Sequence, residues 1–116
     1  MDHFEIWVDV KDSHRDLEFA ERVAQYLGEL KSRKLIHDFR VKRRKLGWGP
    51  PELPEWNITI LVENMAQLEQ AFGTVARRDG PIEDFHRAVY TQVTSFKSAL
   101  YRDFPDPQRV RPPAKP

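Results

Sequence analysis

The sequence predicts an α+β protein in which a four-stranded antiparallel sheet carries helices on one face. Residues 4–10 and 56–62 alternate apolar and polar side chains, the period of two that is typical of half-buried strands. Residues 17–30 and 65–76 instead repeat apolar side chains every three to four positions, which indicates amphipathic helices. Because the chain has only 116 residues, these strands and helices must share one core.

The first part of the chain predicts a strand followed by a helix. Phe4, Ile6 and Val8 lie on the core face of the first strand. Ser13, with Asp16 three residues later, is typical of the start of a helix, which we expect to end near Ser32. The apolar stripe of this helix comprises Leu17, Ala20, Val23, Ala24, Leu27 and Leu30.

A hairpin is predicted in the middle of the chain. Its first strand, residues 35–45, begins with apolar side chains and becomes basic from Lys42 to Lys45. A connection rich in glycine and proline, residues 47–54, leads to the second strand of the hairpin, residues 56–62. The turn composition and the two flanking apolar patterns therefore favour antiparallel pairing.

The last third predicts two helices and a segment with two interpretations. Asn64 is suited to cap a helix with Gln67 in the reciprocal position, and Gly80 and Pro81 end this helix and begin another. The expected buried stripe comprises Met65, Leu68, Phe72, Val75 and Ala76, continued by Ile82, Phe85 and Val89. Residues 94–104 fit either a helix or a strand. We predict a strand, because it would cover the open edge of the first strand.

The resulting order, strand, helix, strand, strand, helix, strand, is that of the ferredoxin-like βαββαβ sandwich. The compact arrangement has the spatial strand order four, one, three, two, with the helices on one face of the sheet. Residues 1–106 form this domain, and residues 107–116 are expected to be a proline-rich disordered tail.

Composition excludes several function classes. The 19 basic and 18 acidic residues nearly cancel, so no overall charge recruits nucleic acid or an anionic membrane. The absence of cysteine excludes disulfides and thiolate chemistry. His3, His14 and His37 are too dispersed for a metal site, and we expect neither metal nor cofactor. Without a leader or an apolar segment long enough to span a bilayer, the protein is expected to be soluble and cytoplasmic, with no membrane partner.

One face of the predicted sheet is open. The side chains directed away from the helices are Glu5, Trp7, Asp9, Arg40, Lys42, Arg44, Asn57, Thr59, Leu61, Tyr101 and Asp103. Acidic groups on the first strand and basic groups on the second are about 10 Å apart across the third strand, where Thr59 is small enough for long side chains to lean over it. Trp7, Leu61 and Tyr101 add an apolar centre. We predict that the same face of a second subunit covers it, the alternative being scattered surface residues with weak ion pairs.

The open face also predicts a ligand site. Aromatic walls with a few charged groups are usual for small-molecule pockets, which favours an organic ligand with an anionic or carbonyl group. The predicted ligand-binding residues are Glu5, Trp7, Asp9, Arg40, Lys42, Trp48, Asn57, Thr59 and Tyr101. Trp48 would act as a lid, and Asp9 or Glu5 as a general base beside Trp7. No catalytic motif is present, so enzymatic activity stays open.

The segment His3–Val10 resembles the first strand of the dimeric α/β-barrel proteins, particularly the stress-responsive A/B-barrel group, in which a histidine stands four residues before an aromatic residue. Residues 99–106 and 44–50 look like those of a small bacterial set of ferredoxin-like proteins with no assigned activity. This resemblance implies two sheets packed face to face around a cavity. In different relatives that cavity holds small hydrophobic substrates or haem, or catalyses cofactor-free oxidation or isomerisation.

Haem is not expected here. Haem-degrading relatives use an asparagine, a tryptophan and a histidine, and this chain has Asn57, Trp7 and His86 at spacings that do not reproduce the motif. We place His86 on a helix surface. A single-stranded nucleic-acid module is the rival class, supported by the basic run Arg40 to Lys45 near Trp48. The third strand lacks stacking aromatics and the net charge is near zero, so the sequence weighs against it.

Overall fold

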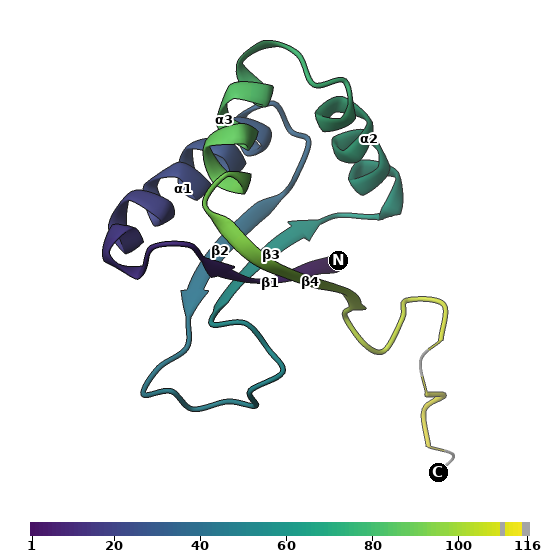
Figure 1. The fold of residues 1–116 in the computed structure, drawn as a ribbon. Coiled ribbons are helices and arrows are strands. Elements are labelled where there is room, and N and C mark those ends of the chain that lie inside the picture. Colours follow the sequence, from purple (N-terminus) through teal and green to yellow (C-terminus); the bar gives the residue numbers. More distant parts are fainter. Residues whose placement is uncertain (110, 115–116) are drawn as a thin grey trace.

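The computed structural model describes residues 1–109 and 111–114, in which a four-stranded antiparallel sheet carries its helices on one face (Figure 1). The elements are β1 (Asp2–Val10), a 3-10 helix (Ser13–Arg15), α1 (Asp16–Ser32), β2 (Asp38–Arg43), β3 (Trp56–Val62), α2 (Met65–Ala76), α3 (Gly80–Tyr90) and β4 (Val93–Arg102). The strand order is β2-β3-β1-β4. This order confirms the ferredoxin-like α+β fold.

The central strand β1 fixes the register of the sheet. It pairs antiparallel with β3, where Glu5 lies opposite Thr59, and with β4, where Val8 lies opposite Phe96. The strand interpretation of the ambiguous segment is therefore confirmed. Because opposite residues in a sheet share a face, Phe96 is on the helix side with Val8, and Glu5 and Thr59 are on the open side.

Apolar side chains from the helix side of the sheet and from the helices form the core. Its buried hydrophobic members are Val8, Phe19, Val23, Leu27, Leu30, Leu35, Ile36, Trp56, Ile58, Ile60, Val62, Leu68, Ala71 and Ile82. Phe19 is fully buried and packs edge-on against Trp56, with 5.1 Å between ring centroids. Full burial of a side chain of this size contributes about 1.5–3 kcal/mol through the hydrophobic effect.

The predicted stripe of α1 was wrong at its start. Leu17 is 77% exposed, whereas Phe19, which the prediction omitted, is fully buried. The predicted cap Ser13 lies instead in the 3-10 helix, where the Asp12 carboxylate accepts a hydrogen bond of 2.9 Å from the His14 backbone N–H. This extra turn places the start of α1 at Asp16 and turns Phe19 toward the sheet.

The hairpin strand β2 is shorter than predicted, because it begins at Asp38 rather than at residue 35. Lys34 has a left-handed backbone with a φ of 60°, which ends the turn after α1. Leu35 and Ile36 are buried beside the core before the strand begins. These apolar residues therefore belong to the core but to the connection before β2, not to the strand itself.

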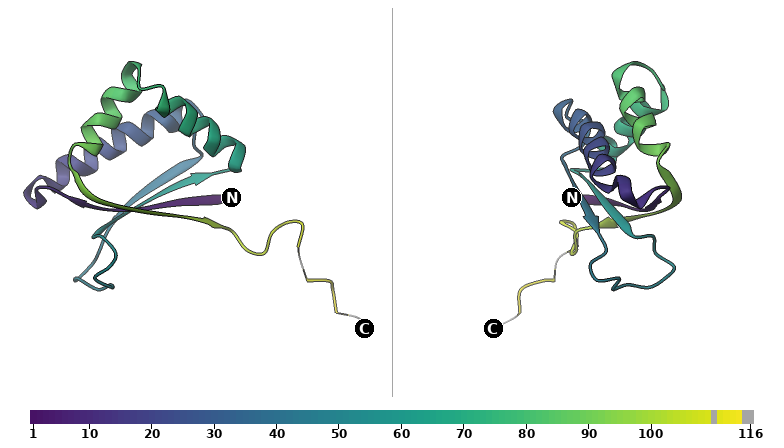
Figure 2. Two further views of the ribbon diagram at one scale, coloured as in Figure 1. Left: turned by 45° about the vertical axis from the view of Figure 1, so that its right-hand side comes forward. Right: turned by 60° about the vertical axis from the view of Figure 1, so that its left-hand side comes forward.

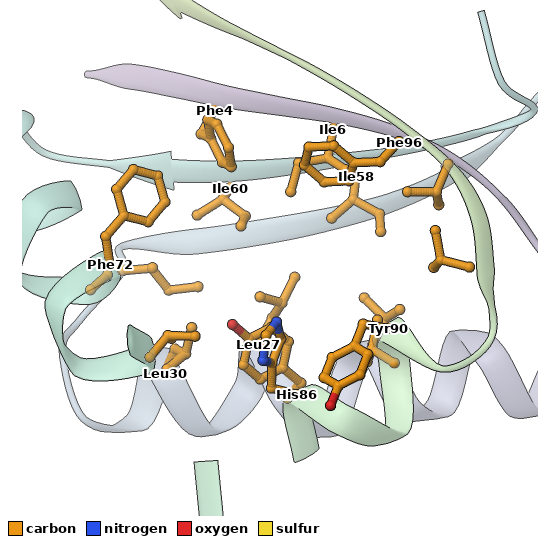
Figure 3. Close-up of a pocket in the computed structure, with 18 of the residues that line it drawn as sticks. Phe4, Ile6, Leu27, Leu30, Ile58, Ile60, Phe72, His86, Tyr90 and Phe96 are labelled. Carbon is orange, nitrogen blue, oxygen red and sulfur yellow. The ribbon is translucent and has the colours of Figure 1, made fainter. Parts of the chain in front are cut away.

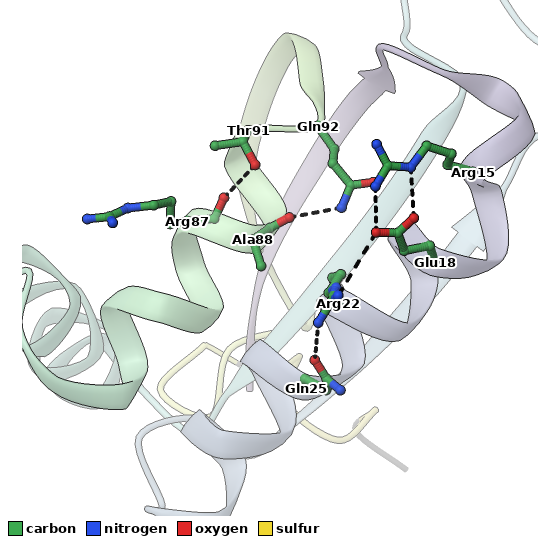
Figure 4. Close-up of polar contacts among 8 residues, drawn as sticks. All are labelled: Arg15, Glu18, Arg22, Gln25, Arg87, Ala88, Thr91 and Gln92. Carbon is green, nitrogen blue, oxygen red and sulfur yellow. Dashed lines mark hydrogen bonds and ion pairs between the residues drawn. The ribbon is translucent and has the colours of Figure 1, made fainter.

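A side-chain cap marks the start of α2, and two side-chain hydrogen bonds mark the end of α3. The predicted cap of α2 is confirmed, since the Asn64 side chain accepts a hydrogen bond of 2.9 Å from the Gln67 N–H. At the end of α3, the side chains of Thr91 and Gln92 donate to the carbonyls of Arg87 and Ala88 (Figure 4). The Gln92 bond supplies a partner for the Ala88 carbonyl, and the Arg87 carbonyl also accepts a hydrogen bond from the Thr91 backbone N–H.

The helices arch over one face of the sheet, and the β2–β3 loop projects on the other side (Figure 2). After β4 the chain leads away from the body of the protein (Figure 1). Residues 110, 115 and 116 of the predicted tail lie outside the described residues, so the tail at 107–116 stays a prediction. In the part of the chain that the structure describes, no helix is both long and apolar enough to cross a membrane.

Candidate functional site

The open face of the sheet holds a closed polar network at its centre. The Thr59 hydroxyl lies 2.5 and 2.7 Å from the two carboxylate oxygens of Glu5 and donates to that group. The Lys42 ammonium reaches across and donates to the Thr59 oxygen at 2.6 Å. Thr59 is buried and the Glu5 side chain is only 16% exposed. These groups use one another as partners, as the small size of Thr59 led us to expect.

Two other predicted ligand residues on this face also have structural partners. The Asp9 carboxylate accepts a hydrogen bond of 2.9 Å from the Glu55 backbone N–H, and the Asn57 amide donates to the Ile6 carbonyl at 3.1 Å. Arg40 and Tyr101 are exposed and Trp7 is half-buried. A ligand site on this face stays a prediction, and its polar centre already satisfies its own hydrogen bonds.

Trp48 stands apart from the rest of the predicted site. It lies on the β2–β3 loop and is 86% exposed. The loop is tied by Arg44, whose guanidinium donates to the carbonyls of Pro50 and Leu53 at 3.2 and 2.8 Å. At Gly49 a Cβ atom would lie 2.6 Å from Arg44 Nε, so this position accepts only glycine while Arg44 keeps its place. The loop thus holds Trp48 in solvent.

A cavity lies on the other side of the sheet, between the strands and the helices (Figure 3). Its volume is about 500 Å³. The wall on the sheet is apolar and comes from alternate residues of β1 and β3, namely Phe4, Ile6, Val8, Ile58 and Ile60. The opposite wall includes Val23, Leu27 and Leu30 of α1. The residues that build the core therefore also enclose this space.

The cavity opens where helices do not cover the sheet. Phe72 of α2 is 50% exposed and packs edge-on against Phe4 with 5.4 Å between ring centroids. Tyr90 and Phe96 also line the cavity and are 42% and 61% exposed. Exposed aromatic side chains thus surround the cavity mouth. Phe72 was predicted to be buried, and that prediction was wrong, because the ring contacts Phe4 at its edge and leaves half of its surface exposed.

Polar groups gather on one wall of the cavity. His86 of α3 lies between Tyr26 of α1 and Tyr90, with ring centroids 5.2 and 5.0 Å from its own. Its Nδ1 is 3.7 Å from the Glu83 Oε2 atom, and neither buried atom has a hydrogen-bond partner within residues 1–109 and 111–114. The Arg87 guanidinium lies 3.7 Å from the other Glu83 oxygen. His86 therefore lines this wall with an unsatisfied imidazole nitrogen, and the unsatisfied acid Glu83 lies next to it without lining the cavity itself.

Tyr26 completes the polar wall. Burial, with a smaller contribution from the negative charge of Glu83, raises the pKa of the Tyr26 hydroxyl to about 12. The hydroxyl is therefore neutral at physiological pH and can donate a hydrogen bond. Together the wall offers a donor at Tyr26 and an imidazole at His86.

Sequence reasoning missed this wall. His86 was placed on an outer helix surface, which is wrong, because its ring lines the cavity and its side chain is 29% exposed. Trp7 and Asn57 lie on the open face, so the sheet separates them from His86 and the haem-type set is not brought together. The buried Glu83, three residues before His86 on a helix with an apolar stripe, was the available signal. Among the described residues, no group of three or more His, Asp or Glu could hold a metal ion.

Comparison with known proteins identifies the family. Residues 1–115 match the family described as "Family of unknown function (DUF6614)", so this chain belongs to that family. A search of curated proteins found no match.

Solved structures with the same fold share little sequence with this chain. The protein At3g17210 from Arabidopsis thaliana is 8% identical, with a TM-score of 0.70 over 91% of this chain and 98% of its own. A dimeric ferredoxin-like protein of unknown function from Jannaschia is 10% identical, with a TM-score of 0.63 over 88% and 98%. A protein from Bordetella bronchiseptica, described as a candidate antibiotic biosynthesis monooxygenase, is 15% identical, with a TM-score of 0.60 over 88% and 96%. At these identities the likeness establishes the fold alone.

Proposed function

We propose that this protein is a homodimer that binds a small, mainly apolar molecule in the cavity between sheet and helices. The observation that carries the proposal is the cavity itself, about 500 Å³ with apolar walls and a few polar groups on one side. Small-molecule sites usually have this size and makeup. The sequence-based prediction of a small-molecule ligand is kept, and its position moves to the helix side of the sheet.

The homodimer is proposed to form through the open face. Trp7, Leu61 and Tyr101 supply apolar area around the closed polar network of Glu5 and Thr59. Satisfied polar groups surrounded by apolar side chains suit burial against a second copy, because Glu5, Thr59 and Lys42 keep one another as partners when water is excluded. The Jannaschia protein with the same fold is described as dimeric, which supports this assembly.

A second candidate is a cofactor-independent oxygenase or isomerase that uses the same cavity. The unsatisfied Glu83 and His86 favour it, because acid and base groups in an apolar site are typical of proton-transfer chemistry. The Bordetella protein supports an enzyme of the oxygenase class. Single-stranded nucleic acid ranks below both, since the net charge is only +1. A cytoplasmic location stays a prediction.

The proposal predicts that an apolar dye binds in the cavity. Anilinonaphthalene sulfonate should bind saturably to the folded protein, with a rise in dye fluorescence. Ala76, at the end of α2, lines the cavity and is exposed, so Ala76→Phe should occupy its mouth without disturbing the core and weaken binding about ten-fold or more. Ala66→Phe on the same helix lies outside the cavity lining and should leave binding unchanged.

The same titration separates the cavity from the open face. If the dye binds on the open face, Arg40→Ala should weaken binding more than Lys34→Ala, and Ala76→Phe should have no effect. That result would return the ligand site to the open sheet face. Binding that is not saturable in the wild-type protein would contradict both positions.

A further inference from the structure

Glu83 and His86 form a pair whose hydrogen bonds are incomplete in the described ranges. The Glu83 Oε2 and His86 Nδ1 atoms are buried, lack hydrogen-bond partners in the described ranges and lie 3.7 Å apart. That separation is too long for a hydrogen bond. Buried polar atoms are normally paired, so two adjacent exceptions beside a cavity point to a pair that closes into a hydrogen bond when a ligand binds the imidazole.

The position of Glu83 indicates which nitrogen of the His86 imidazole carries a proton and which is free to accept one. An ionised carboxylate only accepts hydrogen bonds, so the Nδ1 atom that faces it is the nitrogen suited to carry a proton. The other ring nitrogen, Nε2, then holds the lone pair. Because the two nitrogens point to different sides of the ring, Nε2 is directed away from Glu83. Figure 3 shows the His86 ring beside Leu27 and Tyr90, on the helical wall that faces the sheet.

We propose that His86 is the proton acceptor for an acidic hydroxyl of the ligand, so that the cavity takes phenols or enols. This inference rests on the proposed binding function and names its ligand class. In the bound complex the ligand O–H bond breaks and an Nε2–H bond forms, which leaves a phenolate or enolate beside an imidazolium. The positive charge draws His86 and Glu83 from 3.7 Å to hydrogen-bond distance, so that the carboxylate accepts the Nδ1–H of the imidazolium and stabilises its charge.

The surrounding groups fit this transfer. Tyr26 of α1 stays neutral because burial raises its pKa to about 12, so it can donate a hydrogen bond to a ligand oxygen. Tyr90 and Arg87 belong to the same helix as His86, and Arg78 lines the cavity before α3. The Arg87 guanidinium lies 3.7 Å from a Glu83 carboxylate oxygen. Two cationic side chains near the wall thus favour an anionic product.

The apolar walls of the cavity favour a ligand with a neutral, weakly acidic hydroxyl over a ligand with a carboxylate. A neutral hydroxyl on an aromatic ring or an enol enters an apolar cavity at a lower desolvation cost than a carboxylate. The aromatic side chains of Phe4, Phe72 and Phe96 can contact a planar ring at the mouth. The ligand class is therefore a planar, apolar molecule with one weakly acidic hydroxyl.

The test uses 4-nitrophenol, whose visible absorbance reports whether its hydroxyl is ionised, and nitrobenzene, which lacks the hydroxyl. At a pH below the pKa of free 4-nitrophenol, the wild-type protein should bind the probe and convert it to the phenolate. His86→Leu should abolish the phenolate signal and weaken 4-nitrophenol binding about ten-fold or more, while nitrobenzene binding stays unchanged. Glu83→Gln keeps the side-chain shape and should lower the ionised fraction of bound probe. His14→Leu, outside the cavity lining, is the matched control and should behave as wild type.

The outcomes distinguish the two proposals. Binding of nitrobenzene with no phenolate signal from bound 4-nitrophenol would overturn the role of His86 and leave the cavity function intact. A phenolate signal that persists in His86→Leu would also overturn that role. Failure of both probes to bind would overturn the proposed function and, with it, this inference.

Discussion

The two faces of the sheet solve the burial of charge in opposite ways. On the open face, Thr59 bridges Glu5 and Lys42 through hydrogen bonds of 2.5 to 2.7 Å. On the helix side, Glu83 is as well buried but has one oxygen without a hydrogen bond. The first arrangement is typical of structural groups and the second of groups that await a ligand. Whether buried polar groups have hydrogen-bond partners therefore distinguishes a proposed interface from a proposed ligand site better than the types of residue present.

The largest effect is expected from Trp7→Glu. If the open face is the dimer interface, this change places an unpaired charge among apolar side chains and should abolish the dimer at micromolar concentrations. Light scattering measures the mass. Gln70→Glu, on an exposed residue of α2, changes the net charge equally and serves as the charge-matched control. A wild-type mass that is monomeric across the micromolar range would show that the open face is not an interface.

A smaller effect should distinguish the two buried carboxylates. Thr59→Val removes the hydroxyl that satisfies both Glu5 and Lys42, and should lower the free energy of unfolding by about 1–2 kcal/mol. Glu83→Gln removes a charge that lacks a full set of partners, and should change the free energy of unfolding by less than about 0.5 kcal/mol. Urea denaturation at one protein concentration compares them. A larger loss for Glu83→Gln than for Thr59→Val would show that Glu83 is a structural group.

The smallest effect is expected at the end of the chain. Truncation after Asp106 keeps β4 and the ion pair of 2.9 Å between Arg102 and Asp106. The removed residues lack apolar periodicity, so the melting temperature should stay nearly constant. Thermal denaturation followed by circular dichroism measures it. A decrease of many degrees would mean that the last ten residues pack on the domain or on the second copy.

The sequence was sufficient for the fold because its periodicities are local. Strands β1 and β3 and the capping of α2 followed from alternation and from Asn64. The start of α1 did not follow, because Asp12 caps the 3-10 helix that precedes α1, and α1 begins at Asp16 with Phe19 packed in the core and without a side-chain cap. Tertiary contact overrides a short capping pattern in such cases.

The cavity could not be predicted in the same way. Its walls are core residues by pattern, and whether apolar faces meet or leave a space depends on the angle between the helices and the sheet, which no spacing encodes. His86 was visible only as a histidine on a helix. Its burial against Tyr26 requires that α1 and α3 pack together, which is a contact between distant parts of the chain.

Two hydrogen bonds from the Arg44 guanidinium restrict the length of the β2–β3 loop. Arg44, directly after β2, donates to the carbonyls of Pro50 and Leu53, six and nine residues further along the chain. Both carbonyls must therefore lie within reach of one guanidinium. Surface loops usually accept insertions and deletions at small cost. Here the gain or loss of one residue between Gly49 and Leu53 would move a carbonyl out of reach. Substitutions on the outer side of the loop leave the Arg44 hydrogen bonds intact, so apart from Gly49 the length of this loop is more restricted than its sequence.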